Sequence, residues 1–322
     1  MKLLVTGGAG YIGGHIVHLL HKKHEITVFD SLVGGHKASL PNIHFVKGCL
    51  SDTALLDRTF AEGKFDAVLH LAGFIEAGES MQKPEKYFQN NTVNGLNLLN
   101  AMIKHNVKKI VYASTAAIYG QPKEVPITED AEKVPTNYYG LSKLMFENML
   151  DACKVHGIKN ISLRFFNASG AGFGIGEHHE PETHLIPLIL QVPLGKRDCI
   201  KLFGNDYPTK DGTCVRDYIH VLDIAKAYEL ALKALEEGKE GKYNLGTGKG
   251  HSVKEVIDAA REVTGHAIPL KEEVRRAGDP PFLIASGEKA MKELGWKPEY
   301  SLKEIVQSAW EWHRKNPDGF KE

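Results

Sequence analysis

Short apolar runs alternate with longer helix-period segments over the first half of the chain. A single apolar run could also belong to a buried helix, but the length and β-branched content of these runs favour strands. Strands separated by helical segments are typical of a parallel sheet with crossover helices. The expected strands are Lys2–Thr6, Glu25–Phe29, Asn42–Val46, Ala67–Leu71, Lys109–Ala113 and Asn160–Phe165. We therefore predict a Rossmann-type, doubly wound α/β domain over residues 1–166.

The pattern changes after Phe166. A glycine-rich loop comes first, and shorter elements with recurrent prolines follow. Two capping boxes mark helix starts, Ser252 with Glu255 and Ser301 with Glu304. We predict a smaller mixed α/β substrate-binding lobe over residues 167–322, and leave open that some of its segments return to the first domain.

The composition is that of a compact globular protein. A length of 322 residues suits two packed lobes, and 42% hydrophobic with 25% charged residues lies close to globular averages. The 40 basic and 40 acidic side chains give a formal net charge of zero. Because no global positive field would attract a polyanion, we expect no nucleic-acid partner.

Cysteine usage and hydropathy indicate a cytoplasmic protein. The four cysteines are far apart and form no Cys-x-x-Cys pair, so we expect reduced thiols with neither a disulfide framework nor a zinc knuckle. The apolar run at the N-terminus ends at Thr6, which favours a first strand over a signal peptide. No stretch reaches the roughly 20 apolar residues of a membrane span, so no membrane association is expected.

A glycine-rich turn follows the first expected strand. Gly7, Gly10 and Gly13 lie between that strand and a helix. Glycines allow a tight turn and let backbone N–H groups approach a pyrophosphate at the helix N-terminus. An ordinary βα turn is the alternative, but the flanking elements and an acidic residue after the second strand favour a dinucleotide site.

That acidic residue is Asp30. Its carboxylate can accept hydrogen bonds from the ribose hydroxyls of adenosine and would repel a 2′-phosphate. The sequence therefore predicts NAD rather than NADP. A helix N-cap is the structural alternative for Asp30.

Tyr139 and Lys143 form a Tyr-x-x-x-Lys pair whose side chains share one face of a helix. An ammonium beside a phenol favours the phenolate and would lower the pKa of Tyr139. Such a pair also arises by chance. Ser114 and Thr115 strengthen the functional interpretation, because they end a strand at the carboxyl edge where ligands of such folds bind. Tyr138 has the wrong register for Lys143.

The glycine spacing Gly-x-x-Gly-x-x-Gly resembles that of the extended short-chain dehydrogenase/reductase superfamily. Within it, the whole chain resembles the UDP-glucose/UDP-galactose 4-epimerases. The resemblance rests on Gly7–Gly13, Leu71–Gly73, Gly78–Ser80, Ser114–Gly120, Tyr139–Lys143, Leu163–Asn167, Phe203–Pro208, Asp211–Thr213, Val215–Val221 and Arg275–Pro280.

The resemblance implies NAD-dependent inversion of carbon 4 of a UDP-hexose through a 4-keto intermediate. It places Tyr139, Lys143 and Thr115 as catalytic residues. It implies cofactor contacts for Gly7, Gly10, Tyr11, Ile12, Gly13, Asp30, Leu50, Leu71, Ala72, Gly73, Ser114, Tyr139, Lys143 and Phe166. It implies UDP-sugar contacts for Thr115, Tyr139, Asn167, His184, Leu185, Phe203, Arg216, Arg276, Asp279 and Leu283. It also implies a homodimer that pairs through helices including the one that carries Tyr139.

Several positions depart from the commonest family pattern. Cys49 and Leu50 stand where many members carry an aspartate for the adenine amino group, and Ile75 replaces a lysine near the cofactor. Both changes put the strength of cofactor binding in doubt. Thr115 replaces a serine but retains the hydroxyl. Leu283 stands where a tyrosine is associated with excluding N-acetylated sugars, although it could equally be a core residue.

Alternative functions remain at this stage. The 4,6-dehydratases need a carboxylate pair after the threonine, where this chain has Ala116 and Ala117, so dehydration is disfavoured. Epimerisation of UDP-N-acetylglucosamine or UDP-glucuronate stays open, as does a noncatalytic NAD-binding protein on the same fold. We expect no metal, because His178, His179 and His184 lack a ligand spacing such as His-Glu-x-x-His.

Overall fold

The main sheet of this computed structural model, which describes residues 1–276 and 279–321, is parallel throughout. In the described part of the chain it has seven strands in the order β11-β6-β5-β4-β1-β2-β3. They are β1 (Lys2–Thr6), β2 (Glu25–Asp30), β3 (His44–Lys47), β4 (Ala67–His70), β5 (Lys109–Thr115), β6 (Lys159–Phe165) and β11 (Gly241–Leu245). The six strands expected from the sequence are confirmed to within two residues at each end.

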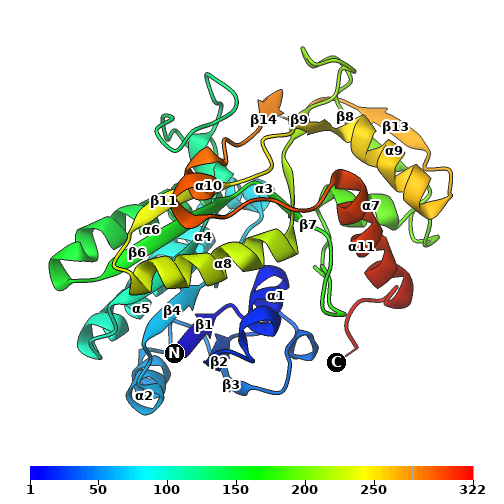
Figure 1. The fold of residues 1–322 in the computed structure, drawn as a ribbon. Coiled ribbons are helices and arrows are strands. Elements are labelled where there is room, and N and C mark those ends of the chain that lie inside the picture. Colours follow the sequence, from blue (N-terminus) through cyan, green and yellow to red (C-terminus); the bar gives the residue numbers. More distant parts are fainter. Residues whose placement is uncertain (277–278, 322) are drawn as a thin grey trace.

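Helices cover both faces of this sheet (Figure 1). Side chains alternate along each strand, so Leu3 and Val5 of β1 pack on one face and Leu4 on the other. The first face is covered by α1 (Tyr11–Leu20) and α8 (Val221–Glu236). The second is covered by α2 (Thr53–Gly63), α5 (Asn94–Lys104) and α6 (Tyr138–Ala152). The Rossmann-type fold class is confirmed.

A second hydrophobic cluster lies beside this domain, where Figure 1 shows α7, α9 and α11 grouped together. These helices are α7 (Leu185–Leu190), α9 (Val253–Thr264) and α11 (Leu302–Lys315). Both expected capping boxes are present, because Ser252 and Ser301 each accept from the backbone N–H of the glutamate three residues later. The boundary at residue 166 remains a prediction, since α8 and β11 come later in the chain and pack with the first domain.

Short elements connect these layers. The small sheets pair β10 with β7, β13 with β8, and β9 with β12 and β14. Their strands are β7 (Asn167–Ser169), β8 (Ile200–Phe203), β9 (Val215–Arg216), β10 (Tyr218–His220), β12 (His251–Ser252), β13 (Leu270–Glu273) and β14 (Phe282–Leu283). The remaining helical elements are η1 (Lys37–Ser39), α3 (Ala77–Ser80), α4 (Pro84–Tyr87), η2 (Phe88–Val93), η3 (Ala116–Tyr119), η4 (Cys153–His156) and α10 (Glu288–Leu294).

Candidate active site

The glycine turn after β1 is too close to its neighbours for side chains. Gly7 has φ +73°, and a Cβ there would lie 2.4 Å from the backbone N of Ala72. A Cβ on Gly13 would lie 2.3 Å from the carbonyl oxygen of Gly7. Helix α1 begins after Gly10 without a side-chain cap, so its first N–H groups have no side-chain acceptor. This turn therefore fits the pyrophosphate of a dinucleotide.

Asp30 lies beside the glycine turn at the end of β2. Its Oδ2 accepts from the backbone N of Ala9 at 2.9 Å, and its Oδ1 accepts from the N of Leu32 at 2.8 Å. The helix N-cap alternative is wrong, because the next helical turn, η1, has His36 at its N-cap. Burial raises the pKa of Asp30, while the hydrogen bonds from Leu32 and Ala9 lower it. Each oxygen keeps a lone pair with which to accept from a ribose hydroxyl.

Tyr139 and Thr115 meet where α6 begins and β5 ends. Asn137 caps the helix by accepting from the backbone N of Gly140 at 2.8 Å. Burial raises the pKa of Tyr139, whereas a side-chain hydrogen bond with Thr115 lowers it. Tyr138 is 36% exposed, which agrees with its expected register away from Lys143.

Lys143 is buried one helical turn after Tyr139. Its Nζ donates to the carbonyl oxygen of Ala113 at 3.0 Å and lies 5.2 Å from the centroid of the Tyr112 ring. Burial lowers the pKa of Lys143 to about 8. Burial outweighs the other effects on the pKa of Tyr139, and the ammonium of Lys143 is hydrogen-bonded to β5, so the expected lowering of that pKa by Lys143 stays a prediction.

Asn91 is a neighbour of Lys143 that sequence reasoning missed. It lies in the π-helical turn η2, a rare conformation that is frequent at functional sites. Its side chain accepts from the N of Phe74 at 2.8 Å and donates to Ser142 Oγ at 3.0 Å. A Cβ on Gly73 would lie 3.1 Å from both Asn91 Oδ1 and Lys143 Nζ. A polar asparagine inside a helical segment was the available sequence signal.

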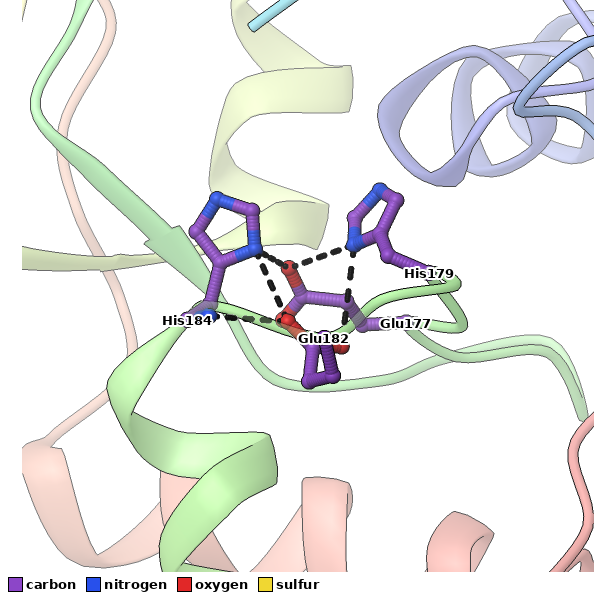
Figure 2. Close-up of side chains that lie close together, drawn as sticks. All are labelled: Glu177, His179, Glu182 and His184. Atoms are coloured by element: carbon purple, nitrogen blue, oxygen red, sulfur yellow. Dashed lines mark hydrogen bonds and ion pairs between the residues drawn. The ribbon is translucent and has the colours of Figure 1, made fainter. Parts of the chain in front are cut away.

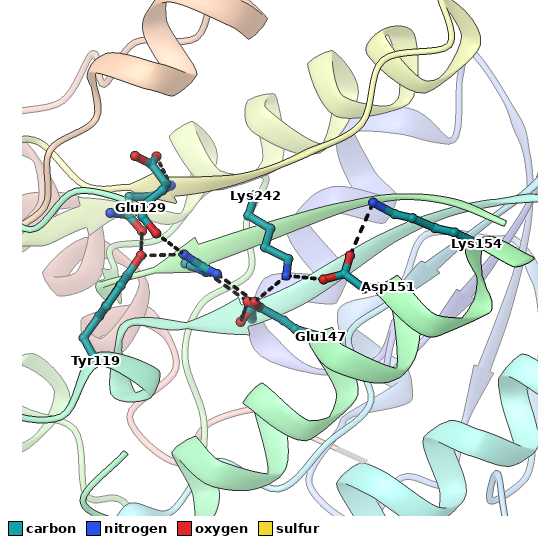
Figure 3. A network of polar contacts seen from close by, with 9 residues as sticks. Tyr119, Glu129, Glu147, Asp151, Lys154 and Lys242 are labelled. Carbon is teal, nitrogen blue, oxygen red and sulfur yellow. Dashed lines mark hydrogen bonds and ion pairs between the residues drawn. The ribbon is translucent and has the colours of Figure 1, made fainter. Parts of the chain in front are cut away.

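A buried polar network holds α6 one turn after Lys143 (Figure 3). Ser114 Oγ donates to Glu147 Oε1 at 2.5 Å, and Glu147 also accepts from Arg164. The hydroxyl of Ser114 is thus directed at Glu147, and its expected cofactor contact stays a prediction. Glu147 and Arg164 were missed, although Glu147 follows Lys143 by one turn on the same helix face.

The remaining expected cofactor residues lie beyond the carboxyl ends of the strands or at the start of α1. Leu50 follows β3, Leu71 and Ala72 follow β4, and Phe166 follows β6. Tyr11 OH donates to the carbonyl oxygen of Gly170 at 2.6 Å, and Ile12 is half-buried next to it. This edge is where such folds bind dinucleotides.

Arginines expected to contact UDP lie near β8 and β9. Arg216 Nη2 lies 3.5 Å from Asp279 Oδ1, and Arg276 Cζ lies 4.1 Å from the centroid of the Phe203 ring. Leu283 pairs in register with Arg216 between β14 and β9. The structure thus brings together five of the expected substrate residues. Ala277 and Gly278 of the same motif lie outside the described residues.

Asn167 lies on β7, His184 caps the N-terminus of α7 and Leu185 is its first residue. Asp217 was missed by the sequence analysis. Its carboxylate, which is fully buried, accepts from the N of Thr247 at 2.8 Å and from the N of Ala285 at 3.1 Å. Asp217 therefore fixes the loop after β11 next to β9 and β14.

Four ionisable side chains meet in the loop before α7 (Figure 2). One ligand atom from each of Glu177, His179, Glu182 and His184 lies within 4.8 Å of the others. Burial lowers the pKa of His184, but the carboxylates of Glu177 and Glu182 raise it overall to about 11. The spacing of the histidines in the sequence argued against a metal site, but in the structure two of them form a compact cluster with two glutamates.

Two expectations about the whole chain can be compared with the structure. Cys49, Cys153, Cys199 and Cys214 are free, as expected. Within residues 1–276 and 279–321, none of the helices has the length and apolar character needed to cross a membrane.

Comparison with known proteins places the chain among sugar-nucleotide enzymes. Residues 3–246 match the model of the NAD dependent epimerase/dehydratase family. A UDP-glucose 4-epimerase of Halalkalibacterium halodurans is 48% identical over 326 residues, covering 99% of this chain and 98% of that protein. The crystal structure of a UDP-glucose 4-epimerase matches with a TM-score of 0.97 and 46% identity, covering 99% of both chains. That of the Bifidobacterium longum UDP-glucose 4-epimerase with NAD+ and UDP matches with a TM-score of 0.94 and 40% identity, covering 99% of this chain and 100% of that one.

Proposed function

Because the chain belongs to the NAD dependent epimerase/dehydratase family, we propose that it inverts carbon 4 of a UDP-hexose and interconverts UDP-galactose and UDP-glucose. The observation that carries this proposal is the side-chain contact between Tyr139 and Thr115, with Lys143 one turn further along α6. This arrangement can exchange a proton with a sugar hydroxyl at the edge of the dinucleotide site.

Each residue of this group has a separate role. Tyr139, as phenolate, removes the proton of the 4-hydroxyl, and Thr115 donates a hydrogen bond to the same oxygen. Lys143 holds the nicotinamide ribose and contributes positive charge near the phenolate. NAD, when bound, supplies the oxidation and then the reduction at carbon 4. Gly7, Gly13 and Asp30 would hold its pyrophosphate and adenosine ribose.

The second lobe binds the UDP part. Arg216 and Arg276 neutralise the diphosphate, a role that suits a permanently charged guanidinium with forked donors. Asp279 orients Arg216 or accepts from the uridine ribose, and Phe203 and Leu185 contribute apolar contacts. Firm binding of UDP with loose contacts to the hexose lets the 4-keto sugar turn and present its other face.

Dehydration remains disfavoured at this site. Ala116 and Ala117 follow Thr115 in η3 and offer no acid or base for eliminating water. We also propose a homodimer, since Leu96 of α5 and Met145 of α6 are 43% and 40% exposed and large exposed apolar side chains suit an interface. The cytoplasmic location expected from the cysteines stays a proposal.

The decisive experiment follows the conversion of UDP-galactose by purified protein without added reductant. A coupled UDP-glucose dehydrogenase reports the UDP-glucose formed. We expect steady turnover, most of which is lost in Tyr139→Phe. Conversion only in the presence of a stoichiometric reductant, or none at all in protein that retains NAD, would contradict 4-epimerisation.

A further inference from the structure

The loop between β7 and α7 carries a cluster of ionisable side chains of which only His184 is expected to contact the UDP-sugar. Glu177, His179, Glu182 and His184 converge there, each offering one oxygen or nitrogen atom (Figure 2). We propose that these four side chains bind one divalent cation of the Zn²⁺ type.

The distances between the four side chains fit tetrahedral coordination. His184 Nδ1 lies 3.0 Å from Glu177 Oε1 and 3.1 Å from Glu182 Oε1. His179 Nδ1 lies 3.5 Å from Glu177 Oε1 and 3.7 Å from Glu182 Oε2. In a tetrahedral site with bonds of about 2.0–2.1 Å, neighbouring ligand atoms are roughly 3.3–3.4 Å apart. These four distances lie on either side of this spacing. Two of them reach different oxygens of Glu182, and the ligand atoms of the whole cluster lie within 4.8 Å of one another, so the side chains would move closer together around an ion.

The charges also call for a cation. The side chains of Glu177 and Glu182 are 6% and 8% exposed, so two carboxylates are buried together. A divalent cation bound between them would balance the charge of both carboxylates, and an uncompensated buried charge is costly. His179 Nδ1 is buried and has no hydrogen-bond partner in the described part of the chain. It faces both carboxylates at 3.5 and 3.7 Å, a spacing that an ion between them could bridge.

Backbone hydrogen bonds hold one of the ligands in place. Glu182 Oε1 accepts from the N of Thr183 and from the N of His184, both at 2.8 Å. Such outer contacts orient carboxylate ligands. Two imidazoles favour Zn²⁺ over Ca²⁺ or Mg²⁺, which prefer oxygen ligands alone. Four protein ligands fill a tetrahedral shell, so the cation would be structural and would fix the start of α7, where Leu185 lies.

Metal binding to the tag-free full chain tests this proposal. After treatment with a chelator and dialysis, the protein should take up about one Zn²⁺ per chain and unfold at a higher temperature with the metal than without. Co²⁺ in its place should give the visible absorption bands of tetrahedral coordination. His179→Gln and Glu177→Gln should each weaken binding at least about tenfold.

His178→Gln is the matched control. His178 precedes His179, but its ring stacks on that of His36 at 4.5 Å and its Nε2 faces Glu180 at 3.4 Å, outside the cluster. The control should keep the affinity and stoichiometry of the unmodified protein. Equal loss in His178→Gln and His179→Gln, or a folded His179→Gln with unchanged affinity, overturns the proposal. So does the absence of tetrahedral Co²⁺ bands in the unmodified protein, a result that does not depend on the folding of any variant.

Discussion

Arg164 and Glu147 form a buried ion pair with two hydrogen bonds. Arg164 Nη2 lies 2.8 Å from Glu147 Oε2, and Arg164 Nε lies 3.0 Å from Glu147 Oε1. The two side chains are 2% and 0% exposed. Glu147 lies on α6 one turn after Lys143, whereas Arg164 lies on β6. The pair therefore holds the helix that carries Tyr139 and Lys143 against the sheet.

Glu147→Gln should lower both stability and turnover. The change leaves the guanidinium of Arg164 buried without its counter-charge, so we expect the free energy of unfolding to fall by about 3–5 kcal/mol. Turnover should fall more than KM rises, because the helix that positions Tyr139 is loosened. Urea unfolding and steady-state kinetics measure the two effects.

Asp151→Asn is the control for Glu147→Gln. Asp151 lies one turn further along α6, bonds Lys242 at 2.6 Å and is 40% exposed. Its loss should change stability by less than about 1 kcal/mol. If the free energy of unfolding fell equally in Glu147→Gln and Asp151→Asn, burial of the ion pair with Arg164 would not be the source of its stabilising effect.

Tyr139→Phe should reduce turnover by about 10²–10⁴-fold, because general acid–base groups contribute that much. Binding of UDP should stay nearly unchanged, since only the phenolic oxygen is removed. Tyr138→Phe is the matched control, because Tyr138 is the exposed neighbour on the same helical turn. Near-normal turnover in Tyr139→Phe would refute its assignment as the base.

Local patterns predicted the elements that form the cofactor edge. The strand β1, the glycines at 7 and 13 and the carboxylate of Asp30 are encoded within short windows of sequence, where alternation and turn chemistry act directly. The capping box at Ser252 is equally local, since its partner is three residues away.

Long-range pairings could not be predicted in the same way. Strand β11 pairs with β6 although their paired residues Gly241 and Ile161 are 80 positions apart in the sequence (241 − 161). No local signal specifies that partner. The sequence around Glu147 likewise contains no pattern that predicts its ion pair with Arg164. His179 and His184 were considered as metal ligands and rejected on their spacing. Their convergence with two glutamates was not predicted, because irregular loop spacing carries no periodicity.

Lys143→Met should make nucleotide-free protein more stable at neutral pH. Burial lowers the pKa of Lys143 from 10.5 to about 8, so between these values the unfolded chain binds more protons than the folded one. Stability therefore rises with pH through this window, and the cost of burying the ammonium is fully present below pH 8. Removing the ammonium should raise the free energy of unfolding by about 1–3 kcal/mol at pH 7. Loss of its hydrogen bond to Ala113 offsets part of this gain.

Urea unfolding of Lys143→Met and the unmodified protein from pH 7 to pH 10 tests this linkage. The stability gap should shrink as the pH rises, and a constant gap would contradict it. The same variant should turn over more slowly, with a pH optimum shifted upward, because the phenolate of Tyr139 loses nearby positive charge. An unchanged pH profile would argue against that coupling.

Asp30 should make the protein select NAD. Mass analysis of the cofactor released from purified protein should find NAD without a 2′-phosphate, because the buried carboxylate would repel that group. Asp30→Ser should weaken NAD binding and improve relative binding of NADP. It also removes the hydrogen bond from Ala9, so the fold is checked by circular dichroism. Predominance of NADP in unmodified protein would refute this role of Asp30.

Leu283 sets the expected range of hexoses. It is half-buried on β14, in register with Arg216, and packs against the cluster that contains Ala116 and Phe166. Leucine is smaller than tyrosine, so we expect space for an acetamido group and detectable conversion of UDP-N-acetylhexosamines beside efficient conversion of UDP-galactose. Leu283→Tyr should suppress the N-acetylated reaction selectively, by about 10-fold or more in kcat/KM, because steric exclusion acts on the larger substrate alone. Leu283→Met is the volume-conserving control and should leave both reactions nearly unchanged. An equal fall for both substrates in Leu283→Tyr, or no N-acetyl activity in unmodified protein, would mean that Leu283 serves only as a packing residue.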